Sequence, residues 1–293
     1  MAKVFIHIGL PKTATTTLQT DVFPHLDNSI FYVGVHQPRS SYKSDLYVKF
    51  MKSIRYGSDI ALTKSMLMEQ LSTGRNILIS EENICVSESM ATWEKKIERL
   101  SCILNGLNYK IIVTIREPSK AIYSYYVELN DLFRKKKKSF IDIALNDESM
   151  KIYHYTFFFN FISNNFDVNN LHVFKFEDIV KGEISGILEL LEQQNCQDNF
   201  RLSNNNSKNK NNNYILIKKK QTILTFFLEY RLINYLVDFL NIKRYRFLYK
   251  FLFNIRMKKN IKIKKPNNQE IKQLSNSLRS DIDFVNKMFK VDF

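Results

Sequence analysis

The chain has 293 residues, of which 44% are hydrophobic and 25% charged, so it can bury a sizeable core and is not disordered as a whole. Its formal net charge of +15 excludes a strongly acidic protein and predicts affinity for polyanions or acidic surfaces. We expect neither a signal peptide nor a transmembrane span, because Lys12 interrupts the first apolar run and no uncharged apolar stretch reaches about 18 residues. This favours a cytoplasmic location, with peripheral contact at the inner face of an anionic membrane as an alternative.

Apolar, partly β-branched runs predict five buried strands, and segments with helical periodicity lie between them. The predicted strands cover residues 4–8, 30–33, 76–80, 109–115 and 171–176. The predicted helices cover residues 18–26, 58–71, 93–107, 121–133 and 153–166. This alternation predicts an α/β fold of three layers, in which helices cover both faces of a central parallel sheet. Such sheets bind ligands at the carboxyl ends of their strands, so functional residues are expected just after each strand.

The first such place is the sequence VFIHIGLPKTATTTLQ, residues 4–19, where Gly9 and Pro11 end the first strand. A lysine and a hydroxyl-rich helix start follow directly. Free backbone N–H groups at a helix start, threonine hydroxyls and a lysine ammonium are all donors to an anion. We therefore predict a P-loop-like anion-binding loop formed by Pro11, Lys12, Thr13, Ala14, Thr15, Thr16 and Thr17.

The second place is the sequence KIIVTIREPSKAIYSYYV, residues 110–127. Arg116 follows a buried strand, and Glu117 with Pro118 suits the first positions of a helix. Ser124 lies eight residues after Arg116, about two helical turns into that helix. A guanidinium at the strand end and a hydroxyl on the helix suit the binding of a second phosphate.

Taken together, LPKTATTTLQ (residues 10–19) and IREPSKAIYSYY (residues 115–126) resemble the two signature elements of the sulfotransferases that use 3′-phosphoadenylyl sulfate (PAPS). The likeness is nearest to bacterial and carbohydrate sulfotransferases. The sequence LHVFKFED, residues 171–178, also resembles the late strand and acidic turn of that family. The family often has Gly where this chain has Ala14, and alanine suits that position if it is helical.

The resemblance implies a role for each matching residue. Lys12 would contact the phosphosulfate and neutralise the leaving phosphate, and the loop of residues 11–17 would bind the 5′-phosphate. Arg116 and Ser124 would bind the 3′-phosphate, and the product would be adenosine 3′,5′-bisphosphate. No metal ion is required for this chemistry, which is expected to resemble phosphoryl transfer by in-line attack.

An acceptor hydroxyl also needs a general base. The sequence NILISEE, residues 76–82, predicts a buried strand followed by two glutamates at the ligand edge of the sheet. Some carbohydrate sulfotransferases resemble this arrangement, with a catalytic glutamate after the corresponding strand. Glu81 is our first choice for the base and Glu82 the second, whereas His7 lies inside a strand and is interpreted as structural.

The composition changes near residue 200. Residues 204–213 are rich in Asn and Lys and predict a surface loop, residues 215–255 suggest two or three helices, and residues 269–288 suggest one amphipathic helix. Residues 208–265 contain sixteen Lys or Arg and only two acidic residues, which gives this segment a net charge of +14. We predict a sulfotransferase core over residues 1–200 and a basic helical extension over residues 201–293, packed on the core.

The leading functional hypothesis is a PAPS-dependent sulfotransferase that acts on a hydroxyl or amine of a saccharide or polyanionic glycan. A P-loop kinase or NTPase is the enzyme alternative, but Pro11 stands where that motif needs Gly, and Arg116 stands where a magnesium-binding Asp would end the strand. The third hypothesis is a basic protein that binds nucleic acid or a membrane surface. No nucleic-acid motif is recognised, which makes nucleic acid the less favoured partner.

Overall fold

The computed structural model describes residues 2–35, 44–130, 132–133, 138–194, 214–222 and 256–293. The loop predicted over residues 204–213 and the helices predicted over residues 223–255 lie outside the described residues.

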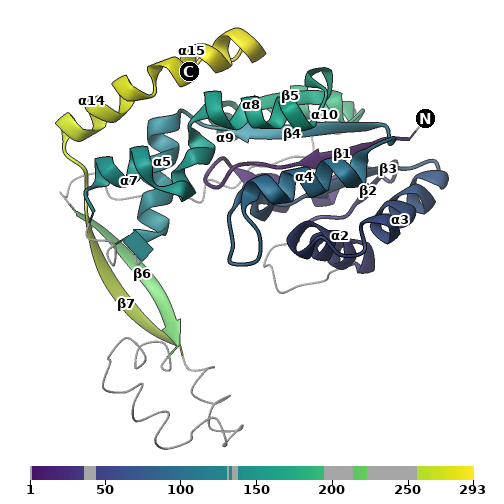
Figure 1. Cartoon of the computed structure of the whole chain (residues 1–293), viewed down its shortest axis with the longest axis horizontal. Coiled ribbons are helices and arrows are strands. Elements are labelled where there is room, and N and C mark those ends of the chain that lie inside the picture. Colours follow the sequence, from purple (N-terminus) through teal and green to yellow (C-terminus); the bar gives the residue numbers. More distant parts are fainter. Residues whose placement is uncertain (1, 36–43, 131, 134–137, 195–213, 223–255) are drawn as a thin grey trace, which may run out of the picture. The chain divides into compact units, whose positions relative to one another are not determined.

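A parallel sheet of five strands forms the centre of the α/β part (Figure 1). Its strands are β1 (Val4–His7), β2 (Ile30–Tyr32), β3 (Asn76–Ser80), β4 (Tyr109–Ile115) and β5 (Leu171–Lys175). They lie in the order β2-β3-β1-β4-β5, and every neighbouring pair is parallel. All five strands predicted from the sequence are confirmed. Because all the pairs are parallel, the carboxyl ends of β3, β1 and β4 meet at one edge of the sheet.

Alternating residues of the strands feed two separate cores, which gives the three predicted layers. Val4 and Ile6 pack with the helices of one face, whereas Phe5 packs with those of the other. The first face is covered by α2 (Asp45–Tyr56), α3 (Ile60–Ser72), α4 (Trp93–Leu104), α5 (Pro118–Glu128), α7 (Phe140–Asn146) and α8 (Tyr155–Asn165). The second face is covered by the turns of residues 18–25 together with α9 (Phe176–Lys181) and α10 (Ser185–Leu190). The predicted α/β class is confirmed.

The helix predicted over residues 18–26 is instead a short composite. One α-helical turn, α1 (Thr15–Thr17), leads into a π-helical turn (Leu18–Val22) and a 3₁₀ turn (Phe23–His25). Pro24 lies in this last turn, where it cannot donate an amide hydrogen bond. Helices α3, α4, α5 and α8 agree with the predictions, whereas α2 and α7 were not predicted. The hydroxyl of Ser44 caps α2 by accepting from the Tyr47 amide. Such a cap marks a helix start, but hydrophobic periodicity does not reveal it.

The C-terminal third differs from its helical prediction. Residues 214–222 form strand β6 (Tyr214–Thr222), which pairs antiparallel with β7 (Arg256–Lys264), so the helix predicted from residue 215 is wrong there. Each strand finds its partner far along the chain, and local periodicity carries no information about such pairing. The single helix predicted over residues 269–288 is two helices, α14 (Asn268–Ser277) and α15 (Arg279–Phe289), which are separated at the buried Leu278.

The chain divides into two compact units, residues 1–207 with 268–293, and residues 208–267. This grouping differs from the expected division at residue 200. Leu274 of α14 and Val285 of α15 belong to the same core as the sheet, so the last two helices are part of the α/β unit. Within the described part of the chain, no helix combines the length and the apolar character that crossing a bilayer requires.

Candidate functional site

The predicted anion-binding loop leaves β1 and first runs beside β4. The amides of Ile8 and Leu10 donate to the carbonyls of Ile112 and Thr114, at 2.9 and 3.2 Å. The backbone then takes two left-handed residues, Lys12 at φ 71° and Ala14 at φ 68°. Ala14 is therefore not helical, so the condition under which alanine would suit this position is not met. A left-handed alanine costs about 1 kcal/mol or more, which explains why glycine suits this position.

Hydrogen bonds among buried polar side chains support the loop. His7 bonds to Ser80 on β3 through Nδ1 at 2.8 Å and to Thr114 on β4 through Nε2 at 3.2 Å. Thr114 bonds to the Thr13 hydroxyl at 2.8 Å, and Gln19 donates to the Ser80 hydroxyl at 3.0 Å. Complete burial lowers the pKa of His7 to about 3, so the ring is neutral and structural, as predicted.

Thr13 belongs to this support rather than to the open side of the loop. Its hydroxyl is fully buried and also donates to the Leu10 carbonyl at 2.5 Å. Pro11 is buried too, and its carbonyl accepts from the Tyr153 hydroxyl at 2.7 Å. Of the predicted loop residues, these two therefore contribute mainly to its shape.

Of the remaining donors of the loop, Lys12, Thr16 and Thr17 lie nearer to solvent, whereas Thr15 is buried. Lys12 forms an ion pair with Glu128 at the end of α5, with Nζ and Oε2 3.2 Å apart. The Thr15 hydroxyl donates to Glu82 Oε2 at 2.7 Å. Thr16 is exposed and Thr17 half-buried, and neither hydroxyl has a hydrogen-bond partner within the described residues. The loop thus offers one cation and two threonine hydroxyls, and carboxylates stand beside Lys12 and Thr15.

The two predicted base candidates have very different surroundings. Glu81 is fully buried, and its carboxylate accepts from the Tyr47 hydroxyl and from the Asn83 amide. Glu82 is half-buried and is the carboxylate that contacts Thr15 of the loop. The geometry therefore favours Glu82, the second choice from sequence, as the group that can meet an acceptor.

Arg116 lies directly after β4, as predicted. Its guanidinium carbon is 4.2 Å from the centre of the Phe176 ring, and its Nε is buried without a hydrogen-bond partner in the described residues. Burial lowers the pKa of Arg116, and the nearby carboxylates of Glu177 and Glu117 act in the opposite direction. An arginine stacked in this way keeps its charge, and its unpaired N–H remains available for an anion.

Helix α5 carries the other half of this second element. Glu117 caps the helix by accepting from the amides of Ser119 and Lys120, at 3.1 and 2.9 Å, and Pro118 occupies its first turn. Ser124 lies half-buried on α5, seven positions into the helix. Both predicted anion-binding elements therefore start at the carboxyl ends of adjacent strands, β1 and β4.

Several residues around the site were given no individual role from the sequence. Tyr153 and Tyr155 bond to the backbone of Pro11 and Arg116, while Phe176 stacks on Arg116 and Glu128 pairs with Lys12. Phe176 lies in the segment of residues 171–178 that resembles the family, whereas the sequence neighbourhoods of the other three resemble those of ordinary helix and core residues. Only the folded chain brings these side chains to the two motifs.

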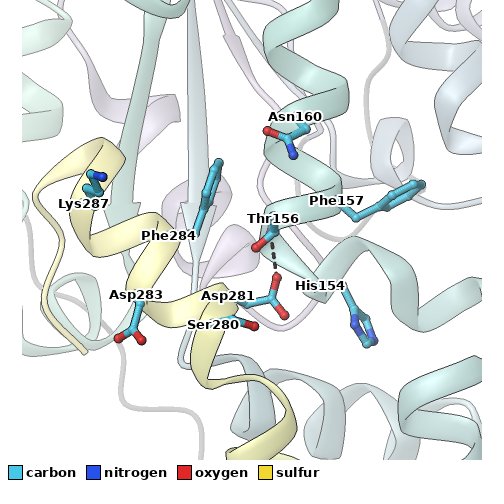
Figure 2. A pocket seen from close by; sticks show the side chains of 9 residues that line it. All are labelled: His154, Thr156, Phe157, Asn160, Ser280, Asp281, Asp283, Phe284 and Lys287. Carbon is cyan, nitrogen blue, oxygen red and sulfur yellow. Dashed lines mark hydrogen bonds between the residues drawn. The ribbon is translucent and has the colours of Figure 1, made fainter.

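A separate groove of about 630 Å³ opens between α8 and α15, and no predicted site residue lines it (Figure 2). Its lining residues are His154, Thr156, Phe157, Asn160, Ser280, Asp281, Asp283, Phe284 and Lys287. In the described part of the chain, no group of three or more His, Cys, Asp or Glu side chains is placed to hold a metal ion.

Comparison with known proteins gives a likeness in structure only. No protein-family model matches the chain, and no curated protein matches it. A crystal structure of a sulfotransferase from Alicyclobacillus acidocaldarius superposes with a TM-score of 0.50 at 11% identity, covering 99% of this chain and 96% of that one. A sulfotransferase domain from the curacin biosynthetic pathway gives a TM-score of 0.37 at 16% identity, covering 65% and 74% of the two chains. On the first of these likenesses, and on its own parallel sheet, the chain has a sulfotransferase-like fold.

Proposed function

We propose that this protein is a sulfotransferase that moves the sulfuryl group of PAPS to a hydroxyl or amine acceptor. The observation that carries the proposal is the placement of two anion-binding elements on one edge of the sheet. The Lys12 loop follows β1, and Arg116 follows the adjacent parallel strand β4. A donor with phosphate groups at two positions of one nucleoside requires two such sites close together.

The residues present suit the two ends of this donor. The loop would hold the 5′-phosphosulfate through the backbone around Ala14, the hydroxyls of Thr16 and Thr17, and the Lys12 ammonium. Arg116 would hold the 3′-phosphate, for which its buried and unpaired Nε is an unused donor, and Ser124 would add a hydroxyl. Lys12 would leave Glu128 for the anion.

Glu82 would act as the general base. In the transfer it would accept the acceptor's proton while the acceptor oxygen or nitrogen forms a bond to sulfur. The bond between sulfur and the bridging phosphate oxygen would break, and the negative charge left on that oxygen would be stabilised by Lys12. Positioning and electrostatic stabilisation would supply most of the rate enhancement, as in phosphoryl transfer.

The test is calorimetric binding of adenosine 3′,5′-bisphosphate to the wild type and to two arginine variants. Arg116→Ala should weaken binding about tenfold or more, because a charge-assisted phosphate contact contributes about 1.5–3 kcal/mol. Arg75→Ala is the matched control, since Arg75 also stacks on a phenylalanine, Phe31, but precedes β3 at the amino edge of the sheet. No binding to the wild type, or equal losses in both variants, would refute the proposal.

We further propose that the acceptor is a saccharide, and that a polyanionic glycan binds to the basic strands β6 and β7. The register places Lys219 opposite Lys259 and Lys220 opposite Lys258. The two strands thus carry lysines at paired positions, and a polyanion would be attracted to this concentration of positive charge.

A sulfated polysaccharide should therefore bind with an affinity that falls steeply with salt, and the double variant Lys219→Glu with Lys220→Glu should bind it more weakly. Equal binding of the sulfated polysaccharide by both proteins, or binding that does not depend on salt, would contradict this prediction. Binding only to anionic vesicles would instead favour contact with a membrane surface.

A further inference from the structure

One short segment contacts the backbone of both anion-binding elements. It is the junction between a 3₁₀ turn (Glu148–Tyr153) and α8, and it carries two fully buried tyrosines. The Tyr153 hydroxyl donates to the Pro11 carbonyl at 2.7 Å, directly before Lys12. The Tyr155 hydroxyl donates to the Arg116 carbonyl at 2.5 Å and accepts from the Arg116 amide at 3.2 Å. Two residues apart in sequence, these tyrosines reach motifs that are more than a hundred residues apart.

Each tyrosine is itself held in place. The Tyr153 ring meets Tyr125, the neighbour of Ser124 on α5, edge to face with ring centres 5.6 Å apart. The Tyr155 ring stacks on Phe293 at 6.4 Å. Next to Tyr155, the Thr156 amide donates to Asp281 of α15 at 2.7 Å, the bond drawn in Figure 2. The C-terminal helix thus fixes the start of α8 and, with it, Tyr155.

Both hydroxyls are in the neutral, protonated form. Burial raises the pKa of Tyr153 and Tyr155 well above the usual tyrosine value, and neighbouring acidic groups raise it further, whereas the hydrogen bond with the Arg116 backbone lowers the pKa of Tyr155 by a smaller amount. A neutral phenol can donate to a carbonyl, and it can donate and accept at once, as Tyr155 does with Arg116. The contacts at both elements are therefore maintained throughout the physiological pH range.

We propose that Tyr153 and Tyr155 are positioning residues that set the two phosphate contacts separately, Tyr153 for the 5′ end of the donor and Tyr155 for the 3′ end. The inference rests on the proposed function. Neither tyrosine needs to touch the nucleotide, because each fixes the backbone of the residue that does, or of its immediate neighbour. Since both lie two residues apart on one junction, the segment also links the backbone of the two elements.

The test compares the variants Tyr153→Phe and Tyr155→Phe with three ligands in calorimetry. These ligands are adenosine 3′,5′-bisphosphate, adenosine 5′-phosphate and adenosine 3′-phosphate. Tyr155→Phe should weaken the bisphosphate and the 3′-phosphate about tenfold and leave the 5′-phosphate unchanged. Tyr153→Phe should weaken the bisphosphate and the 5′-phosphate to a similar degree and leave the 3′-phosphate unchanged.

A merely structural role would lower the binding of all three ligands equally in both variants, and that result would overturn the inference. Unchanged binding of every ligand would overturn it as well. If the wild type bound none of the ligands, the proposed function itself would fail, so the two failures are distinguishable. Tyr109→Phe is the control, because Tyr109 begins β4 at the opposite edge and its hydroxyl bonds only weakly to Asp167, at 3.4 Å.

A second variant covers the case in which Tyr155→Phe does not fold. Asp281→Asn weakens the acceptor for the Thr156 amide while the Tyr155 hydroxyl stays in place. It should reduce the affinity for the two ligands that carry a 3′-phosphate, by less than Tyr155→Phe would, and spare the 5′-phosphate. Weaker binding of adenosine 5′-phosphate together with unchanged binding of adenosine 3′-phosphate would contradict the assignment.

Discussion

The two elements proposed to bind anions at the carboxyl edge of the sheet each accept a tyrosine hydroxyl bond on their backbone, but the rest of their support differs. The loop after β1 rests on a chain of buried hydrogen bonds among His7, Ser80, Thr114 and Thr13, and two of its residues are left-handed. The element after β4 rests on backbone contacts from Tyr155, the stack on Phe176, and a helix cap by Glu117.

Their free groups differ as well. Lys12 and Thr15 of the loop already contact carboxylates, whereas Arg116 keeps a buried donor without a partner in the described residues. The loop therefore depends on close packing around Gly9 and on the neutral form of the buried His7. The second element depends on aromatic and backbone contacts, which are less sensitive to pH.

The strongest test of close packing is Gly9→Ala. An added Cβ would lie 2.4 Å from the Thr114 hydroxyl oxygen and 2.4 Å from the Thr15 methyl. We expect a loss of about 3 kcal/mol in the free energy of unfolding, measured with denaturant, because overpacking displaces the support of the loop. Gly74→Ala is the control: Gly74 is left-handed but has open space, so only about 1 kcal/mol of backbone strain is expected. Similar losses in the two variants would show that the loop is not closely packed.

The second prediction separates the two glutamates beside the loop. Glu82→Gln should lower the rate of sulfuryl transfer about a hundredfold with little change in nucleotide affinity, because the general base is lost. Glu81→Gln should instead lower the free energy of unfolding by about 2 kcal/mol, since one amide oxygen cannot serve both buried donors equally well. Turnover and denaturation curves of both variants decide the matter. If Glu81→Gln were stable but inactive and Glu82→Gln were active, the general base would be Glu81, the first choice from the sequence.

The third prediction concerns the pH dependence of stability. His7 has a pKa of about 3 in the folded protein and about 6.5 in the unfolded chain, so between these values the unfolded state binds the extra proton. Stability is therefore lost as the pH falls below about 6.5, by about 2 kcal/mol from pH 7 to pH 5 for this group. His7→Gln should lack this part of the loss in denaturant unfolding at the two pH values. An equal loss of unfolding free energy between pH 7 and pH 5 in both proteins would mean that His7 is not neutral and buried.

The smallest effect is expected at the left-handed Ala14. Ala14→Gly should stabilise the protein by about 0.5–1 kcal/mol, because glycine tolerates φ 68° but loses more entropy on folding. Ala61→Gly, in the exposed start of α3, should instead destabilise it by about 1 kcal/mol. Thermal or chemical unfolding of both variants tests the pair. A destabilised Ala14→Gly protein would show that the Ala14 methyl packs better than its backbone strain suggests.

Local patterns in the sequence were enough to predict the class of fold and to place the two predicted anion-binding elements after β1 and β4. Its five strands are short apolar runs flanked by turn residues, and its helices are long enough to show their periodicity. Because parallel strands end at one edge, Lys12 and Arg116 could be assigned to the same edge without coordinates. Glu117 and Pro118 marked the start of α5 through local chemistry alone, and the structure agrees.

Contacts between distant parts of the chain were decided only by the tertiary structure. The left-handed backbone at Ala14 occurs in a loop whose start is bonded to β4, and the contrast between Glu81 and Glu82 arises from Tyr47 and Thr15. The pairing of β6 with β7 and the hydroxyl bonds of Tyr153 and Tyr155 likewise join residues far apart in sequence. Periodicity and capping report on a few neighbouring residues, whereas burial and hydrogen-bond partners depend on the whole folded chain.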